Sequence, residues 1–178
     1  MDIITTTPEP KCSDELLHSA ALDGDLTAVK SLLEKGTTVD IARPCTGITP
    51  LMGASIKGHT EIARLLLERG ASLNVFSKTF GLTALHWAAF GGNPETVALL
   101  LDAGATVDAA SPDNGSTPLM MAALSGHLGV VRLLLEKGAD IHALTKDGLT
   151  ALHAAVRFGY SEIVTELVEK SLEINCGN

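Results

Sequence analysis

The feature that most constrains this chain is a motif that returns about every 34 residues. The segment TPLM at Thr49 recurs as TALH at Thr83, TPLM at Thr117 and TALH at Thr150, at spacings of 34, 34 and 33 residues. Self-similarity at such a period is typical of a repeat array in which each unit packs only on its neighbours. We divide the chain into a flexible leader, residues 1–12, and one repeat domain, residues 13–178, with units at 13–45, 46–79, 80–113, 114–146 and 147–178.

Each unit is predicted to form a short helix, a turn, a second helix and an extended loop. The threonine of each motif occupies an N-cap position, and Pro50 and Pro118 follow at the first helical position, where a missing N–H group has no cost. Gly92 and its equivalents end the first helix, and Gly104 and its equivalents end the second. The segments that follow, such as RPCTG and SPDNG, are rich in turn-forming residues and predict projecting hairpins.

These units resemble ankyrin repeats. The family pattern D-G-x-T-P-L-H-x-A-A…G-H-x-E-V-V…L-L-L-x-x-G-A-D is met almost literally by DGLTALHAA, GHTEIARLLLERGAS and GHLGVVRLLLEKGAD, and the resemblance covers residues 13–178. It implies an all-α solenoid of stacked helix-turn-helix units with projecting hairpin loops. Met52 and Met120 depart from the family pattern because they replace its histidine. The hairpins are predicted to be longer by one residue before three of the glycines, Gly47, Gly81 and Gly115.

The two end units are expected to have a polar outer side, because each of them has only one neighbour to bury its apolar face. The position held by leucine in the middle units, as in Leu65 and Leu99, becomes Ser31 in the first unit and Glu166 in the last. Both replacements agree with that expectation.

Composition and charge exclude several classes of function. The net charge is −8 and no basic run exists, so the sequence lacks the cluster of cations that binding a phosphate backbone requires. No apolar run is long enough to span a bilayer, and the N-terminal MDIITTTPEPK lacks the basic and apolar regions of a signal peptide. We therefore expect no nucleic-acid partner, no membrane insertion and a cytoplasmic, intracellular location. The cysteines Cys12, Cys45 and Cys176 are expected to be free thiols.

The six histidines give no pattern of catalysis or metal binding. For His86 and His153, in the TALH segments, the resemblance implies a structural hydrogen bond to the neighbouring unit. His59 and His127 lie in the turn before a second helix, which is also common in the family. No histidine has Cys, Asp or Glu three or four residues later, and no phosphate-binding loop, dinucleotide fingerprint or G-x-S-x-G segment is present. The sequence therefore predicts no cofactor and no metal site, and it contains no enzyme motif.

The few aromatic residues, 3% of the chain, concentrate in the third unit. Phe80, Trp87 and Phe90 occupy positions that the resemblance places on the concave groove, where a chain selected only for solubility would hold polar residues. Trp and Phe are also common at the centres of protein interfaces. Apolar residues stand at the equivalent positions of the other units and beside them: Ile48, Ile56, Leu82, Met121, Leu124, Leu149 and Phe158.

This apolar patch leads to one main hypothesis and three alternatives. The main hypothesis is a non-catalytic protein–protein interaction module that binds an apolar protein segment in its groove. One alternative is a pocket around Trp87 that binds, or acts on, a small apolar ligand, and another is self-association through the patch. In the last alternative the aromatic rings only pack on one another and stiffen the hairpins. An open shelf favours a protein partner, whereas a closed cavity with converging polar groups favours a ligand; the nearby polar candidates are His86, His153, Asp113 and Arg157.

Overall fold

The computed structural model describes residues 13–176; the predicted leader, residues 1–12, and residues 177–178 lie outside the described part. Within that part the chain forms helices, turns and loops without strands, so the expected all-α solenoid is confirmed. None of the described helices is long and apolar enough to cross a membrane. The helices are α1 (Ser13–Asp23), α2 (Leu26–Glu34), α3 (Pro50–Lys57), α4 (Thr60–Glu68), α5 (Ala84–Gly91), α6 (Pro94–Asp102), α7 (Pro118–Ser125), α8 (Leu128–Glu136), α9 (Ala151–Phe158) and α10 (Ser161–Cys176).

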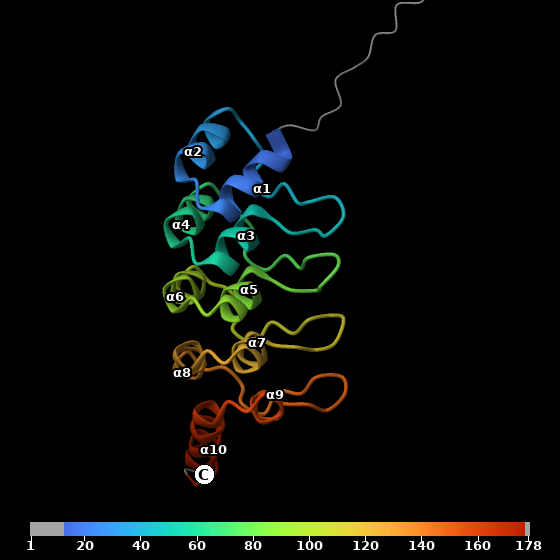
Figure 1. Ribbon diagram of the computed structural model, residues 1–178, viewed down its shortest axis with the longest axis vertical. Coiled ribbons are helices and arrows are strands. Elements are labelled where there is room, and N and C mark those ends of the chain that lie inside the picture. Colours follow the sequence, from blue (N-terminus) through green and yellow to red (C-terminus); the bar gives the residue numbers. More distant parts are fainter. Residues whose placement is uncertain (1–12, 177–178) are drawn as a thin grey trace, which may run out of the picture.

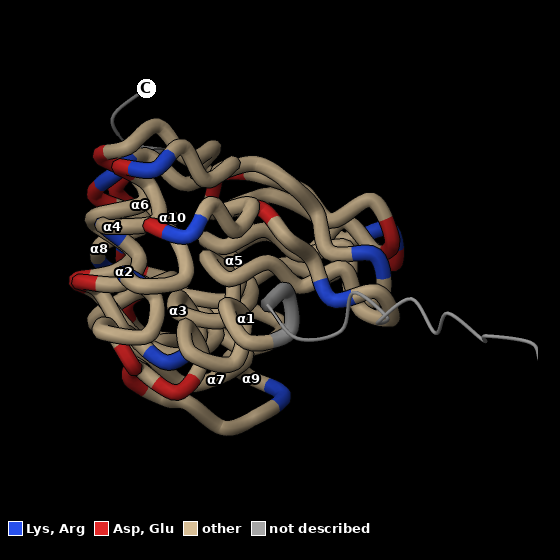
Figure 2. The backbone as a smooth tube through the Cα atoms, turned by 90° about the horizontal axis from the view of Figure 1, so that it is seen from above, with Lys and Arg blue, Asp and Glu red and all other residues tan. Residues whose placement is uncertain are grey.

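The helices stack in two layers along one axis. The first helices of the pairs, α1, α3, α5, α7 and α9, pack on one another, and the second helices form a parallel row beside them (Figure 1). The loops that connect successive pairs project beyond the first helices, away from the second ones (Figures 1 and 2). The core runs along the stack, where each first helix contributes a fully buried alanine, such as Ala88, and each of α1, α3, α5 and α7 also contributes a fully buried leucine, such as Leu85. The small alanines allow the helices to approach closely.

The predicted N-caps form, and they explain how methionine can replace histidine. In α5 the backbone N–H of Thr83 donates to Nδ1 of His86 at 3.1 Å. In α3 the N–H of Thr49 instead donates to the sulfur of Met52 at 3.5 Å. Because a thioether sulfur is a weak acceptor, Met52 partly replaces the imidazole at this position. At the other end of α5, Gly92 has a φ of 71°, which a glycine adopts without strain.

The connecting loops are hairpins, and three of them have the predicted additional residue. The closing N–H to carbonyl bonds join residues five apart in the first three hairpins, Arg43 to Ile48, Ser77 to Leu82 and Ser111 to Ser116. In the last hairpin the corresponding bond joins residues four apart, Thr145 and Leu149. Adjacent hairpins are also connected, since the N–H of Lys146 donates to the carbonyl of Asn114 at 2.8 Å.

The turn of each middle unit caps a helix of the unit before it. Nε2–H of His59 donates to the carbonyl of Leu22 at 3.1 Å, and Nε2–H of His127 donates to the carbonyl of Phe90 at 3.0 Å. Asn93 stands at the equivalent position and donates to two carbonyls at the end of α3, those of Ser55 and Ile56, both at 3.1 Å. Carbonyl groups at a helix end lack partners within the helix, so these side chains satisfy them.

The C-terminal end of the stack is more apolar than the sequence predicts. Glu166 is mostly buried rather than exposed on the outer side, because it forms an ion pair of 2.7 Å with Arg132 of the preceding unit. Val156 is 61% exposed, whereas its equivalents in earlier units, such as Ala89, are fully covered by the next unit. The side chain of Leu172 in α10 is also exposed. The expectation of a polar outer side is therefore wrong for these side chains.

Candidate binding groove

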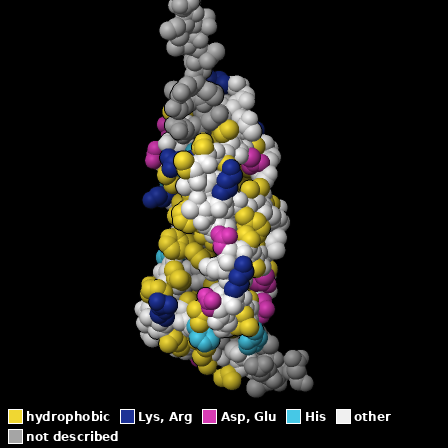
Figure 3. All heavy atoms as spheres, turned by 90° about the vertical axis from the view of Figure 1, so that its right-hand side faces the viewer, with side chains coloured by type: hydrophobic (Ala, Val, Ile, Leu, Met, Phe, Trp, Pro, Cys, Tyr) yellow, Lys and Arg dark blue, Asp and Glu magenta, His cyan; other side chains and the backbone are white. Residues whose placement is uncertain are grey.

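The groove is formed by the hairpins and by the first helices, and most of the predicted site residues lie on its surface. Figure 3 shows hydrophobic side chains gathered along one margin of the hairpin face, over the middle of the stack. Phe80, Phe90, Leu124, Leu149 and Phe158 are exposed, at 37–52%. The others are half-buried: Ile48, Ile56, Trp87 and Met121.

Leu82 differs from the other predicted residues because it is only 8% exposed. Its carbonyl accepts the bond that closes the second hairpin, and its own N–H donates to the hydroxyl of Ser77 at 3.2 Å. The expectation that Leu82 lies on the groove surface is therefore wrong: its side chain is buried beneath the hairpin.

The three aromatic residues of the third unit form one cluster. Trp87 contacts Phe80 edge to face, with ring centroids 5.5 Å apart, and contacts Phe90 in the same way at 6.3 Å. The indole also packs against the core. Its Nε1–H is covered by neighbouring atoms, yet no acceptor for it exists among the described residues. The cluster therefore joins the core to an exposed surface of two phenyl rings.

Beside this cluster, a cavity of about 390 Å³ lies between α7 and α9. Its volume is at the lower end of the range for pockets that hold small molecules, about 300–1,000 Å³. None of the three aromatic residues of the cluster lines it. The candidate groove therefore combines the exposed phenyl rings beside Trp87 with a separate hollow between α7 and α9. The hollow has apolar walls of Met120, Met121, Leu124, Leu149 and Phe158 and a polar rim that includes Asn114, Ser116, Asp147, His153 and Arg157.

The polar residues named as candidates do not converge on one point. His86 is fully buried; it receives the N–H of Thr83 on Nδ1, so its proton is on Nε2, which donates to the carbonyl of Ser116 at 3.0 Å. Burial lowers the pKa of His86. His153 and Arg157 line the cavity, whereas Asp113 and His86 do not. The structural bond to the next unit is therefore confirmed for His86.

His153 forms only the hydrogen bonds within its own unit that His86 also forms. Thr150 donates its N–H to Nδ1 of His153 at 3.1 Å, but no bond to another unit exists for its ring within residues 13–176. Across the same residues, no three His, Cys, Asp or Glu side chains are arranged to hold a metal ion. Cys45 is an exposed free thiol, while Cys12 and the side chain of Cys176 lie outside the described part.

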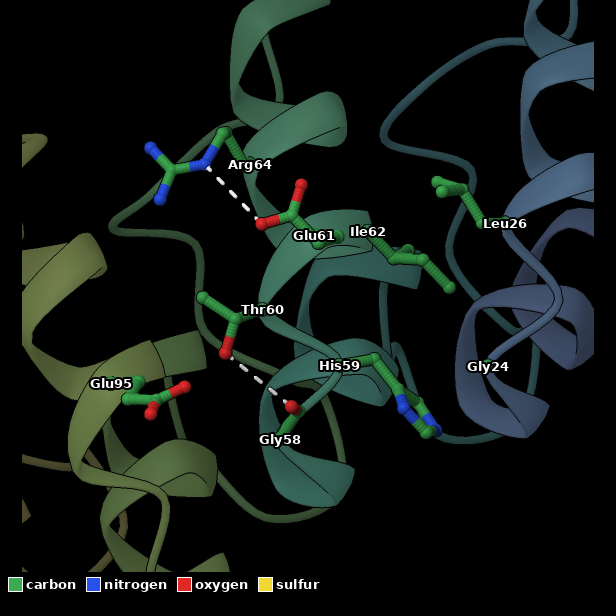
Figure 4. Close-up of a pocket in the computed structure, with 9 residues that line it drawn as sticks. All are labelled: Gly24, Leu26, Gly58, His59, Thr60, Glu61, Ile62, Arg64 and Glu95. Atoms are coloured by element: carbon green, nitrogen blue, oxygen red, sulfur yellow. Dashed lines mark hydrogen bonds and ion pairs between the residues drawn. The ribbon is translucent and has the colours of Figure 1, made fainter.

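A larger hollow of about 650 Å³ lies at the N-terminal ends of the second helices (Figure 4). Most of its polar side chains, although not Glu95, already interact with one another or with the backbone. Thr60 donates to the carbonyl of Gly58, and Arg64 lies 4.0 Å from Glu61. The ring of His59 points toward Gly24 as part of the cap described above. This hollow therefore reflects how the units stack, and the groove is the better candidate site.

The family model described as ankyrin repeats (3 copies) matches residues 17–111, 75–145 and 107–178. The matches overlap and together extend over almost the whole chain. This chain belongs to the ankyrin-repeat family. Ankyrin repeats are generally protein–protein interaction modules, which agrees with an open groove of exposed apolar residues. No match was found among curated proteins.

In this ankyrin-repeat chain, several surface residues were not anticipated from the sequence. Met120 contributes to the cavity wall although it is almost fully buried. Phe76 and Leu144, each just before a hairpin, are 40% and 61% exposed. Their equivalents in the first and third units are alanines, Ala42 and Ala110, so no common residue type marked the position.

Proposed function

We propose that this chain is a non-catalytic binding module that holds an apolar segment of another protein along its concave groove. The observation that carries the proposal is the set of exposed apolar side chains on this side of the stack: Phe80 and Phe90 of the aromatic cluster, and Leu124 and Phe158 of the cavity wall. A large exposed apolar patch on a folded chain usually marks an interaction site. The open form of the groove at Trp87 favours a protein segment over a small molecule.

The aromatic cluster supports binding over a purely structural role. Edge-to-face contacts stabilise the cluster, but two of its three rings remain exposed to water. The covered Nε1–H of Trp87 has no acceptor, and a buried donor without a partner costs about 1–3 kcal/mol. A cluster selected only to stiffen the hairpins would have no reason to combine exposed phenyl rings with an unsatisfied donor. A partner that supplies apolar surface would cover the two exposed phenyl rings.

The size of the patch is sufficient for useful affinity. Complete burial of a large apolar side chain contributes about 1.5–3 kcal/mol. Because these side chains are already partly covered, each contributes less than that when a partner binds. Association itself costs about 4–15 kcal/mol. Four or five anchors, together with backbone hydrogen bonds, can therefore reach micromolar affinity, which corresponds to about 8 kcal/mol.

A random peptide library displayed on phage, selected on the full chain, tests the proposal. Recovered peptides should be apolar, and their affinity should fall at least tenfold when Phe80→Ser, Trp87→Gln and Phe90→Ser are combined. Because Trp87 also packs on the core, melting temperature is compared for Phe80→Ser combined with Phe90→Ser alone, which keeps the indole and should lower the melting temperature less than Leu85→Ala does. The latter removes a fully buried side chain, which costs about 2–5 kcal/mol.

Three results would count against this function. The variant that combines Phe80→Ser with Phe90→Ser could melt as early as Leu85→Ala, which would assign the phenyl rings to the core. The peptides could bind equally well to the triple variant, which would place binding elsewhere. Concentration-dependent sizing could show self-association that the triple variant abolishes, which would make a second copy of the chain the occupant of the groove.

A further inference from the structure

The charges of this acidic chain are distributed unequally between its two sides. The hairpins and the first helices α3, α5, α7 and α9 carry five cations, Arg43, Lys57, Lys78, Lys146 and Arg157, and two carboxylates, Asp113 and Asp147. The acidic residues of α1, Asp14, Glu15 and Asp23, belong to the N-terminal end of the stack. The second helices and the loops directly after them show the reverse. There the acidic residues outnumber the basic ones two to one. The basic residues are Lys30, Lys35, Arg64, Arg69, Arg132, Lys137 and Lys170. The acidic residues are Asp25, Glu34, Asp40, Glu61, Glu68, Glu95, Asp102, Asp108, Glu136, Asp140, Glu162, Glu166, Glu169 and Glu173. Figure 2 shows Lys and Arg on the projecting hairpins, opposite the row of second helices.

No ion pair among the side chains that the structure describes involves a cation of the groove side. Every ion pair among the described residues belongs to the second helices or to their ends: Arg64–Glu61, Arg132–Glu166, Lys137–Asp102 and Lys170–Glu173. Lys146 is bonded only to an uncharged group, since its Nζ donates to the carbonyl of Pro112 at 2.6 Å. These cations therefore have no carboxylate in direct contact among the described side chains.

These cations stand at both ends of the apolar patch. Lys57 follows Ile56 at the end of α3, and Lys78 belongs to the same hairpin as Phe80. At the other end, Arg157 lines the cavity together with Phe158. In Figure 3 the Lys and Arg side chains of this face lie beside the hydrophobic margin at intervals along the stack, with Asp and Glu side chains between them.

Resting on the proposed function, we propose that the segment bound in the groove carries acidic residues on both sides of an apolar centre. Carboxylates on both flanks would meet the two groups of cations while the apolar centre covers the shelf. Complementary charge of this kind sets orientation and partner choice and accelerates association. It would also exclude basic segments, which the net charge of −8 would otherwise attract.

The distance between the two groups of cations limits the length of this segment. Packed helices lie about 8–10 Å apart, so the three steps from α3 to α9 cover about 25–30 Å. An extended chain covers this distance with about 8 or 9 residues, and a helix with about 18. A displayed library of random 20-residue peptides is therefore long enough for either conformation.

The charge composition of peptides selected from that library on the full chain provides the test. Binders should be enriched in Asp and Glu relative to the unselected library, on both sides of their apolar residues. Lys78→Glu combined with Arg157→Glu should weaken the selected peptides about tenfold at 50 mM salt, and much less at 500 mM salt, where charges are screened. The matched control is Lys30→Glu combined with Arg69→Glu, which reverses two exposed charges of the second-helix side. It should leave affinity nearly unchanged.

The outcomes separate this inference from the proposed function. Apolar binders without acidic enrichment, or an unchanged affinity in the Lys78 and Arg157 variant, would overturn the charge inference and leave the groove function standing. Peptides whose affinity is unchanged by the substitutions at Phe80, Trp87 and Phe90 would overturn both the charge inference and the groove function. A single-stranded 20-nucleotide RNA that binds the chain, and is lost in the same charge variant, would assign the cations to phosphate groups and also overturn the inference.

Discussion

At the scale of single residues, the histidine at position 86 links the stack to pH. Its imidazole is fully buried, accepts the N–H of Thr83 and donates to the carbonyl of Ser116. Burial lowers the pKa of His86, and mainly burial lowers that of His18 as well. The folded chain thus favours the neutral ring, and the unfolded chain binds protons more readily below a pH of about 6.5.

We therefore expect the free energy of unfolding to be highest above about pH 6.5 and to fall as the pH decreases below it. Urea denaturation at pH 7.5 and at pH 5.5 measures the loss. His86→Met, which copies the residue found at Met52 and Met120, should reduce the loss, because one buried group that gains a proton on unfolding has been removed. An equal loss in the variant and in the original chain would contradict this account.

A second residue-scale prediction concerns Gly91, which has no side chain although it ends α5 beside the groove. A Cβ at this position would collide with the carbonyl oxygen of Ile56. Gly91→Ala should therefore destabilise the chain by about 1–3 kcal/mol despite the better helix propensity of alanine. Ser125→Ala at the equivalent position of α7 is the matched control. It removes a covered hydroxyl that has no partner among the described residues, so it should change stability by less than about 0.5 kcal/mol. Thermal unfolding of both variants decides the point.

At the scale of helices, the units are joined by caps as well as by apolar packing. Asn93→Ala removes two hydrogen bonds to the end of α3 and should cost about 1–3 kcal/mol. Asn93→Asp should cost more, because a carboxylate would face carbonyl oxygens at the negative end of a helix. The urea midpoint of each variant provides the measurement. Asn74→Ala, which removes one exposed bond to Thr106, should be milder, and a similar loss in all three would contradict the capping role.

The helices could be predicted from the sequence more completely than the contacts between them. The caps, the stop glycines and the longer hairpins follow from residue types at fixed positions in the period. How deeply the side chain at a given position of the repeat is buried does not follow from its residue type, because it depends on the side chains of the adjacent units. At the position shared by Ile48, Leu82 and Leu149, the side chain is half-buried, buried and exposed in turn. For the same reason, the sequence did not reveal that Trp87 joins the core to the groove, or that Asn93 replaces a capping histidine.

At the scale of the whole molecule, the two end units should open before the middle of the stack. Each has one stacking interface, and the side chains that would face a further unit, such as Val156, are exposed. Hydrogen exchange should protect the amides of α5 and α6 most and those of α1, α2, α9 and α10 least. Uniform protection, or a weakly protected middle, would contradict this prediction.

The series arrangement of the helix pairs also has a mechanical consequence. Extensive packing joins helices of one pair or of adjacent pairs, so a force that pulls on the two ends passes through every interface in turn. Small rotations at successive interfaces add together, so the described stack can extend elastically. The weakest interface between helix pairs sets the force at which the stack separates. A ligand that spans α3 to α9 would bridge three of those joints at once. The ligand would then raise the force needed to separate the units that it covers. The outermost interface, between α1 and α3, would remain as compliant as before.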